Sequence, residues 1–489
     1  MIQEKNHPLR HGLMKASNKR RSGIFAELGK IDSLVQTNKF KEALAELCAI
    51  EAVLSSKVPS EELAFYSYLR GFVLWRLGEK KLALEGAQKA LDLYLSFQNL
   101  KGIGKSQNLT GSILIDLGNL RAAEEPLLLA VSGFKMAGDW AQAARALNKV
   151  AHLHSVEGKL NLATYFNKQA RECASKAKDW YYELVLCCSR AVYHRLAGEW
   201  RLALSNLEKF LAESRKADDF FNYVFGLINV GHAHFLKESF KVARKSYLEA
   251  IGVATRENMI GNLKIAYEFL AELSIAEGRF SEAEDYLKKA MEIGERVSPY
   301  GTIMTQCWRL MGDLHLAKKE YDQALKAYET CRSYLIKLPE RLEEGAMYRG
   351  MGICYLHKDQ LSLAQNCFRK GIEIFEACEN NWELAKTYVE AAEWGVFALA
   401  EIRPKLSWAK GIFRELEHPA WETRVQLLLG RSESLSAELP LRLAHEVADR
   451  ERILKVLEGT EGNISRAADK LGITRQALHY KINRYKIDL

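Results

Sequence analysis

The side chains best suited to chemistry lie in the last fifty residues, on the outer face of a helix that we expect from Thr474 onward. This face carries Arg475, Gln476, His479, Lys481 and Arg484. Between Thr474 and Ile487 there are four basic residues and no acidic one. Guanidinium, amide and imidazole groups can donate hydrogen bonds to base edges, and the cations can contact phosphates. The pattern therefore favours DNA binding.

The sequence predicts no catalytic residue, metal site or cofactor site. H-E-x-x-H and G-x-S-x-G are absent, and the nine scattered cysteines include no C-x-x-C pair. Histidines recur at matching positions of neighbouring repeats. The helices that carry them are about 8–10 Å apart, whereas each ligand atom of a metal site must lie within about 2.1 Å of the ion. Residues 102–106 read GIGKS, yet Asn99 replaces the first glycine of a phosphate-binding loop. We expect this stretch to be a linker between repeats.

Two short helices joined by a glycine turn would position the basic face. Asn463 is suited to cap the first helix, Gly472 permits a sharp turn, and Thr474 can cap the second helix. The expected inner positions are Ile464, Ala467, Ala468, Leu471, Leu478, Ile482 and Tyr485. A preceding helix over 441–459 has an apolar face of Leu443, Val447, Ile453, Leu454 and Leu457. This order of elements predicts a helix-turn-helix.

Residues 441–487 closely resemble the Fis-type helix-turn-helix, the DNA-binding module of Fis and of NtrC-like activators. The shared residues are Gly462-Asn463, Arg466-Ala467-Ala468, Leu471-Gly472-Ile473, Arg475 with Leu478, and Lys481, Ile482 and Tyr485. The ATPase that precedes this module in NtrC-like activators has no counterpart here, because repeats stand in its place. The resemblance implies a homodimer in which the 441–459 helix pairs with its twin.

The resemblance also implies roles for individual residues. Thr474 and Arg475 would reach base edges, and the phosphate-contacting positions are occupied by Asn463, Ser465, Ala477 and His479. From the outer face of the helix, Gln476 and His479 are further candidates for base contacts. Lys481 and Arg484 lie further along the helix and are candidates for phosphate contacts.

The body of the chain repeats one unit of about 40 residues. One alanine recurs nine times, with seven intervals of 40 residues and one of 41. Its positions are Ala43, Ala83, Ala123, Ala163, Ala203, Ala243, Ala283, Ala324 and Ala364. A glycine stands five residues earlier in five copies, at Gly78, Gly118, Gly158, Gly198 and Gly278. Small residues let two helices approach closely, and glycine adopts the left-handed turn between them.

This repeat resembles the tetratricopeptide repeat in a 40-residue form, with Trp140, Trp180 and Phe220 at the family's aromatic position. The resemblance implies an all-α fold, in which a superhelix of helical hairpins precedes the small helix-turn-helix domain. We expect a disordered basic arm over 1–22 and nine repeats over 23–403. Capping helices would follow over 404–430, a linker over 431–440 and the DNA-binding domain over 441–489. Pro404 and Pro419 are expected between helices.

Arrays of this family bind proteins or peptides on a concave wall formed by the first helix of each pair. In this register, the wall would include Phe72, Trp75, Ser112, Ile115, His152, Arg195, His232, Phe235, Glu268, Arg309 and Asp313. The mixture of aromatic, basic and acidic groups suits a protein, a peptide or a small effector.

The net charge of +8 is concentrated at the two ends of the chain. Residues 1–22 carry a net +5 and residues 441–489 a net +3, whereas residues 23–440 hold 54 charges of each sign. A neutral body with basic ends indicates that a polyanion binds at the ends. With 48% apolar residues, long disorder is excluded, and neither a signal peptide nor a membrane span is found.

We therefore expect a cytoplasmic bacterial transcription regulator, associated with the nucleoid when bound. Its C-terminal module would bind double-stranded DNA as a homodimer, and its repeats would bind an effector. The alternative is a scaffold for protein–protein interactions whose helix-turn-helix does not bind regulatory DNA.

Overall fold

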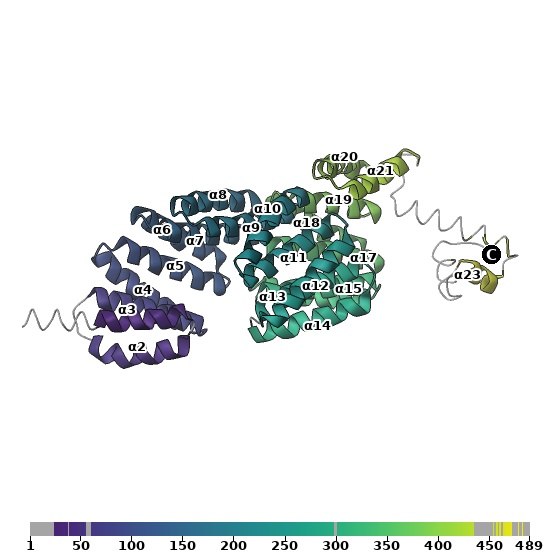
Figure 1. The fold of residues 1–489 in the computed structure, drawn as a ribbon. Coiled ribbons are helices and arrows are strands. Elements are labelled where there is room, and N and C mark those ends of the chain that lie inside the picture. Colours follow the sequence, from purple (N-terminus) through teal and green to yellow (C-terminus); the bar gives the residue numbers. More distant parts are fainter. Residues whose placement is uncertain are drawn as a thin grey trace, which may run out of the picture. The chain divides into compact units, whose positions relative to one another are not determined.

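The structure, a computed structural model, describes four long stretches of the chain and part of the C-terminal segment. The stretches are 24–37, 39–54, 60–297 and 301–434. In the C-terminal segment they are 453, 456–457, 459–460, 463–471, 478 and 482. Over these residues the regular secondary structure is entirely helical, as the sequence predicts (Figure 1). The expected basic arm lies outside the described residues.

The described chain forms two compact units. Unit 1 comprises the described residues up to Tyr193, together with Asn206–Glu213 and Lys337–Pro339. Unit 2 comprises His194–Ser205, Ser214–Ile336 and the described residues from Glu340 onward. The sequence predicts one continuous array and contains no signal for this division.

Unit 1 consists of antiparallel helix pairs. Its helices are one over 24–36, α2 (Phe40–Leu54), α3 (Glu61–Arg76), α4 (Lys80–Ser96), α5 (Leu100–Asp116), α6 (Leu120–Met136), α7 (Trp140–Val156) and α8 (Leu160–Lys176). Two further helices, α9 (Trp180–Leu196) and α10 (Trp200–Lys216), contribute residues to both units.

Unit 2 continues the same pattern. Its pairs are α11 (Phe220–Leu236) with α12 (Phe240–Arg256), α13 (Ile260–Ala276) with α14 (Phe280–Val297), α15 (Thr302–Ala317) with α16 (Tyr321–Leu335), and α17 (Arg341–His357) with α18 (Leu361–Ala377). Three helices follow, α19 (Asn381–Glu393), α20 (Leu399–Glu415) and α21 (Pro419–Ser434). The remaining helix, α23 (Ile464–Leu471), belongs to the C-terminal segment.

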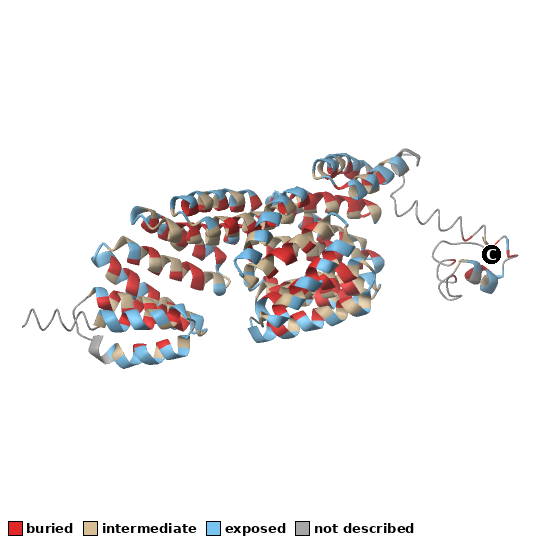
Figure 2. Cartoon of the chain, in the orientation of Figure 1, coloured by how far each residue is buried: buried red, intermediate tan, exposed pale blue. Residues whose placement is uncertain are grey.

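The alanine that repeats every 40 residues is the centre of each pair. All nine alanines, from Ala43 to Ala364, have 0% exposed surface. Figure 2 shows the buried residues along the faces where neighbouring helices meet, with exposed residues on the outward faces. The period in the sequence therefore reports the close approach of two helices in each hairpin.

The turns between helices share one backbone conformation. The five predicted turn glycines all have positive φ, from +73° at Gly278 to +94° at Gly78. Other turns use non-glycine residues in the same left-handed region, among them Gln98, Lys178 and Asp218. The glycine prediction is confirmed, and these other turns lack the glycine that identifies the conformation in the sequence.

Three expectations about local structure are wrong. Residues 102–106 are not a linker but belong to α5, where Asn99 caps the helix by accepting a hydrogen bond from the Gly102 amide at 2.9 Å. A Cβ at Gly102 would lie 2.3 Å from the Tyr94 ring, so glycine serves helix packing there. Pro404 lies inside α20, which begins five residues earlier, at Leu399. Helix α21 extends to Ser434, four residues into the expected linker.

The tight crossing at the repeated alanine predicts the cost of a larger side chain. Ala243, the fully buried member in α12, leaves no room for extra atoms. We expect Ala243→Leu to lower the free energy of unfolding by about 1–3 kcal/mol through overpacking. Urea denaturation followed by circular dichroism measures this change. Val242→Leu, at an exposed neighbouring position, serves as the control and should change stability by no more than about 0.5 kcal/mol.

Candidate functional sites

A charged groove in unit 2 is lined by the first helix of successive pairs. Its lining residues come from the end of α9 and from α11, α13, α15, α17 and α19. The charged ones are Arg195, Glu268, Glu272, Arg309, Glu343, Arg349, Glu383 and Lys386. The groove encloses a cavity of about 170 Å³. The expectation that first helices form the concave wall therefore agrees with the lining of this groove.

Ion pairs across neighbouring helices hold most of these charges. Arg309 of α15 lies 2.5 Å from Asp313 on its own helix and is also paired with Glu343 of α17. Arg349 of α17 lies 2.8 Å from Glu383 of α19. Because these carboxylates surround Arg309, its pKa is raised despite burial, so it remains a cation. The Arg309–Glu343 and Arg349–Glu383 pairs each link the first helices of two neighbouring hairpins.

Arg195 differs from the other groove cations. Its Nη1 contacts the Nδ1 atom of His232, and its guanidinium lies 5.2 Å from the centroid of the Phe269 ring. No carboxylate of the described residues lies within 4.0 Å of it, and its buried Nε has no hydrogen-bond partner. Burial lowers the pKa of Arg195, the reverse of the direction at Arg309. The difference arises because carboxylates contact Arg309 directly, whereas Glu268, Glu272 and Glu343 act on Arg195 only from beyond 4.0 Å and do not offset its burial.

Two carboxyl groups lie on α13 in the same groove. Glu268 has 4% exposed surface, and burial raises its pKa, with Glu272 adding to the shift. Burial also raises the pKa of Glu272, whose Oε2 lies 3.6 Å from Nε2 of His232. Neither carboxyl group lies within 4.0 Å of the Arg195 guanidinium.

Within unit 2, the repeat series closes on itself. The turn after α9 receives a hydrogen bond from Asn380 Nδ2 to the Leu196 carbonyl oxygen, at 3.0 Å. In the same turn, the Gly198 carbonyl oxygen lies 2.8 Å from His418 Nε2. A carbonyl oxygen only accepts, so His418 carries its proton on Nε2 and donates it. Helices α19–α21 are thereby attached to residues about 200 positions earlier in the chain.

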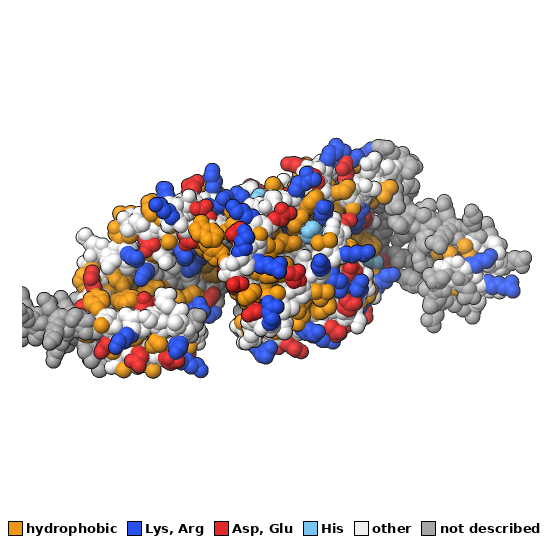
Figure 3. Space-filling model, viewed as in Figure 1, with side chains coloured by type: hydrophobic (Ala, Val, Ile, Leu, Met, Phe, Trp, Pro, Cys, Tyr) orange, Lys and Arg blue, Asp and Glu red, His pale blue; other side chains and the backbone are white. Residues whose placement is uncertain are grey.

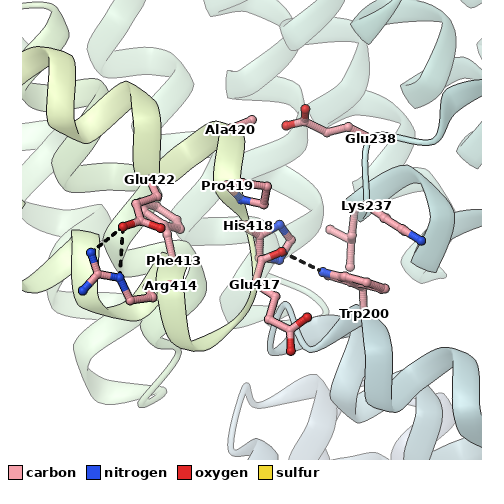
Figure 4. Close-up of a pocket in the computed structure, with 11 residues that line it drawn as sticks. Trp200, Lys237, Glu238, Phe413, Arg414, Glu417, His418, Pro419, Ala420 and Glu422 are labelled. Carbon is pink, nitrogen blue, oxygen red and sulfur yellow. Dashed lines mark hydrogen bonds and ion pairs between the residues drawn. The ribbon is translucent and has the colours of Figure 1, made fainter.

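A second cavity of about 460 Å³ lies at this closure (Figure 4). Its lining includes Trp200, Leu236, Phe413, His418, Pro419 and Ala420, together with the charged residues Lys237, Glu238, Arg414, Glu417 and Glu422. Trp200 Nε1 donates to the Glu417 carbonyl oxygen at 3.3 Å, as the dashed line in Figure 4 shows. Lys237 Nζ lies 4.9 Å from the Trp200 ring. The cavity is therefore mainly apolar and borders the contact between α10 and the α20–α21 turn.

The described part of the C-terminal segment has a small apolar core. Its buried members are Ile453, Leu457, Ala467, Ala468, Leu478 and Ile482. Val456, Ile464 and Leu471 pack against them. The expected inner positions of both helix-turn-helix helices thus meet in one core, and Tyr485 lies outside the described residues.

Asn463 begins the first of these helices. Its Oδ1 accepts a hydrogen bond from the Arg466 amide at 3.2 Å, which confirms the predicted cap of α23. Ser465 and Arg466 are exposed in the first turn of this helix, whereas Ala467 and Ala468 are buried. One face of α23 is therefore free to contact a ligand, and the other is fixed in the core.

Family models match both parts of the chain. Residues 445–485 match the family described as bacterial regulatory protein, Fis family. Residues 303–377, which span α15 to α18, match the tetratricopeptide repeat. The array is of the tetratricopeptide type, and a Fis-type helix-turn-helix follows it. Both sequence resemblances are confirmed, and both families are binding modules.

Solved structures share the tetratricopeptide fold. A Rap protein complexed with competence and sporulation factor has a TM-score of 0.51 at 16% identity, covering 79% of this chain and 99% of its own. The Rap conjugation gene regulator of the plasmid pLS20, complexed with the Phr* peptide, has a TM-score of 0.50 at 13% identity. That match covers 74% of this chain and 97% of the regulator. No curated protein matches the chain.

The predicted effector residues fall in two separate places. In the tetratricopeptide groove of unit 2 the structure brings together Arg195, His232, Phe235 and Arg309, and Glu268 lines the same groove. Phe72, Trp75 and His152 belong to unit 1, where Trp75 Nε1 donates to Asp116 at 2.7 Å. Sequence reasoning missed the groove residues Glu272, Glu343, Arg349, Glu383 and Lys386. They occupy first helices, so the 40-residue register was the signal that could have located them.

The Fis-type residues expected to contact DNA are only partly described. Asn463 and Ser465 are exposed at the start of α23. Thr474, Arg475, Gln476, Ala477, His479, Lys481 and Arg484 lie outside the described residues. Ile453 and Leu457 were expected on a face that pairs with a second copy, but both are buried in the core of the segment itself. These two side chains therefore stabilise the helix-turn-helix directly.

Other kinds of site were also sought over the described ranges. No group of three or more His, Cys, Asp and Glu residues there has the arrangement of a metal site. None of the described helices combines the length and the apolar composition needed to cross a membrane. On the face shown in Figure 3, acidic and basic side chains of the tetratricopeptide helices are interspersed.

Proposed function

We propose that the protein is a sequence-specific transcription regulator, with a Fis-type module that binds double-stranded DNA and a repeat groove that binds a peptide. The observation that carries the proposal is the buried helix-turn-helix core, which coincides with the Fis-family match over 445–485. In this framework Thr474 and Arg475 contact bases, together with Gln476 and His479. Asn463, Ser465, Lys481 and Arg484 contact phosphates.

The proposal includes a homodimer and a cytoplasmic location at the bacterial nucleoid. A single helix-turn-helix reads a few base pairs, and dimers of such modules bind half-sites about 34–36 Å apart. The net charge of +3 over 441–489 supports contact with phosphates at this end of the chain.

The groove of unit 2 supports the peptide part of the proposal. Several helices contribute cations, carboxyl groups and aromatic rings to one concave surface, which matches the chemistry of a peptide backbone with its side chains. The pLS20 regulator, which has the same fold, was solved with a peptide. A peptide is therefore the effector class that we favour over a whole protein or a small molecule.

Separate substitutions of Arg475 and Lys481 test sequence-specific binding. In this proposal Arg475 reads the O6 and N7 acceptors of guanine, a contact worth about 1–3 kcal/mol of discrimination. Arg475→Ala should therefore reduce the preference for the selected site over random DNA by about 5- to 150-fold. Lys481→Ala, the matched control for a phosphate contact, should weaken binding to both DNAs alike and lower the salt slope by about 1.

The measurement uses the intact protein and a duplex site selected from genomic fragments. Fluorescence anisotropy at several salt concentrations then gives the affinity for that site and for random DNA. If Arg475→Ala weakens binding to both DNAs by the same factor, Arg475 does not read a base. A wild-type protein that binds the two DNAs equally would instead favour the scaffold alternative.

A further inference from the structure

The cations in the groove of unit 2 are paired with carboxylates, except at one end. Arg309 and Arg349 each have carboxylate partners, and Lys386 Nζ lies 2.9 Å from Glu383. Arg195 is the exception, because its guanidinium contacts a histidine and an aromatic ring and no carboxylate. A buried cation without a counter-charge is energetically costly, and proteins normally pair it.

The nearby carboxyl groups act on Arg195 only over a longer distance and make no ion pair with it. Glu268 and Glu272 share helix α13 with Phe269, but neither lies within 4.0 Å of the Arg195 guanidinium. The closest ion-pair contacts of Glu272 are to His232 at 3.6 Å and to Arg309 at 4.0 Å. Glu272 is therefore engaged by His232 and Arg309, and Arg195, which lines the cavity, keeps free donor capacity.

We infer that Arg195 is the binding site for a carboxylate of the bound peptide. A guanidinium offers two parallel N–H donors that match the two oxygens of a carboxylate. The Phe235 and Phe269 rings line the same cavity and provide apolar surface for the residue that carries the carboxylate. This inference rests on the proposed function, in which the groove binds a peptide.

The size of the cavity is consistent with one group of a longer ligand. Its volume of about 170 Å³ is below the range of about 300–1,000 Å³ typical of pockets that enclose a whole small molecule. The carboxylate can come from the C-terminus of a peptide or from an Asp or Glu side chain. Both sources present the same pair of oxygens to Arg195.

Three capped dipeptides separate these sources. N-acetyl-Phe-Gln has only the C-terminal carboxylate, N-acetyl-Phe-Glu-amide has only the side-chain carboxylate, and N-acetyl-Phe-Gln-amide has neither. Ligand-detected NMR with the intact protein measures their millimolar affinities. We expect at least one of the two dipeptides that carry a carboxylate to bind about tenfold or more tightly than the uncharged dipeptide. The tighter-binding one shows whether the carboxylate comes from a C-terminus or from a side chain.

Variants then assign the contact to Arg195. Arg195→Gln should remove the advantage of the carboxylate, and Arg195→Lys should restore only part of it, because an ammonium lacks the planar fork. Arg332→Gln is the matched control outside the groove, because it makes the same substitution at an exposed arginine paired with Glu329, and it should retain the advantage. Circular dichroism confirms that each variant is folded.

Equal binding of the three dipeptides to the wild-type protein, or no binding by any of them, would overturn the carboxylate site without reference to any variant. Retention of the advantage in folded Arg195→Gln would overturn the assignment to this residue. DNA binding by the same preparation is measured separately. The proposed regulatory function fails only if the wild-type protein shows no preference for selected DNA.

Discussion

Ala468→Gln is expected to weaken DNA binding by the intact protein severely. Ala468 has 2% exposed surface in the core of the helix-turn-helix, beside the fully buried Ala467. A glutamine there adds atoms to a packed site, at about 1–3 kcal/mol, and buries an amide, at about 1–3 kcal/mol more. A core this small rarely supplies more than about 3–5 kcal/mol of stability. The affinity for DNA should therefore fall by about 100-fold or more.

Lys470→Gln is the matched control, because it introduces the same side chain on the same helix at an exposed position. It removes one positive charge and should change the affinity by less than about tenfold at physiological salt. Anisotropy titrations with a selected duplex compare the two variants. Ala468→Gln binding as tightly as Lys470→Gln would show that this core is not needed to present the DNA-binding face.

Gly198→Ala should produce the largest loss of stability among the turn glycines of unit 2. Gly198 has a φ of +80°, and a Cβ there would lie 2.7 Å from two ring atoms of Trp382. The left-handed conformation costs an alanine about 1–2 kcal/mol, and the clash adds about 1–3 kcal/mol. We expect the free energy of unfolding to fall by about 2–5 kcal/mol in total.

Gly278→Ala isolates the backbone contribution. Gly278 occupies the same place in its repeat, with a φ of +73°, but its Cβ would meet no atom within 4 Å. This variant should lose only about 1–2 kcal/mol. Urea denaturation monitored by tryptophan fluorescence gives both values. Equal losses for the two variants would contradict the close contact between the turn at Gly198 and Trp382.

The substitution at Gly198 should also disturb the contacts that attach the α20–α21 turn to the turn after α9. Trp382 stacks on His418, with ring centroids 4.1 Å apart, and His418 donates to the Gly198 carbonyl oxygen. An alanine that displaces Trp382 therefore strains a contact made by the α20–α21 turn. The cavity at Trp200 borders the same turn, so the start of α21 lies against the repeat that contains Gly198 and Trp200.

Local patterns in the sequence were sufficient for the repeat architecture and for the helix-turn-helix core. The alanine at every 40th position reports one helix crossing, because only a small side chain allows that approach wherever it recurs. Asn463, Ala467, Ala468 and Leu478 are likewise close in sequence, so their spacing alone places them at a cap or in a core. The helical position of Pro404 was missed, because packing overrides local preference there.

Only the tertiary structure decided which charges in the groove are paired and where the array closes. Arg195 and Arg309 occupy first helices and look alike in the sequence, yet only Arg309 meets carboxylates from its own and the neighbouring helices. The contact of Gly198 with His418 joins residues 220 positions apart. Such contacts depend on small rotations accumulated over many repeats, and no local pattern of residues encodes that sum.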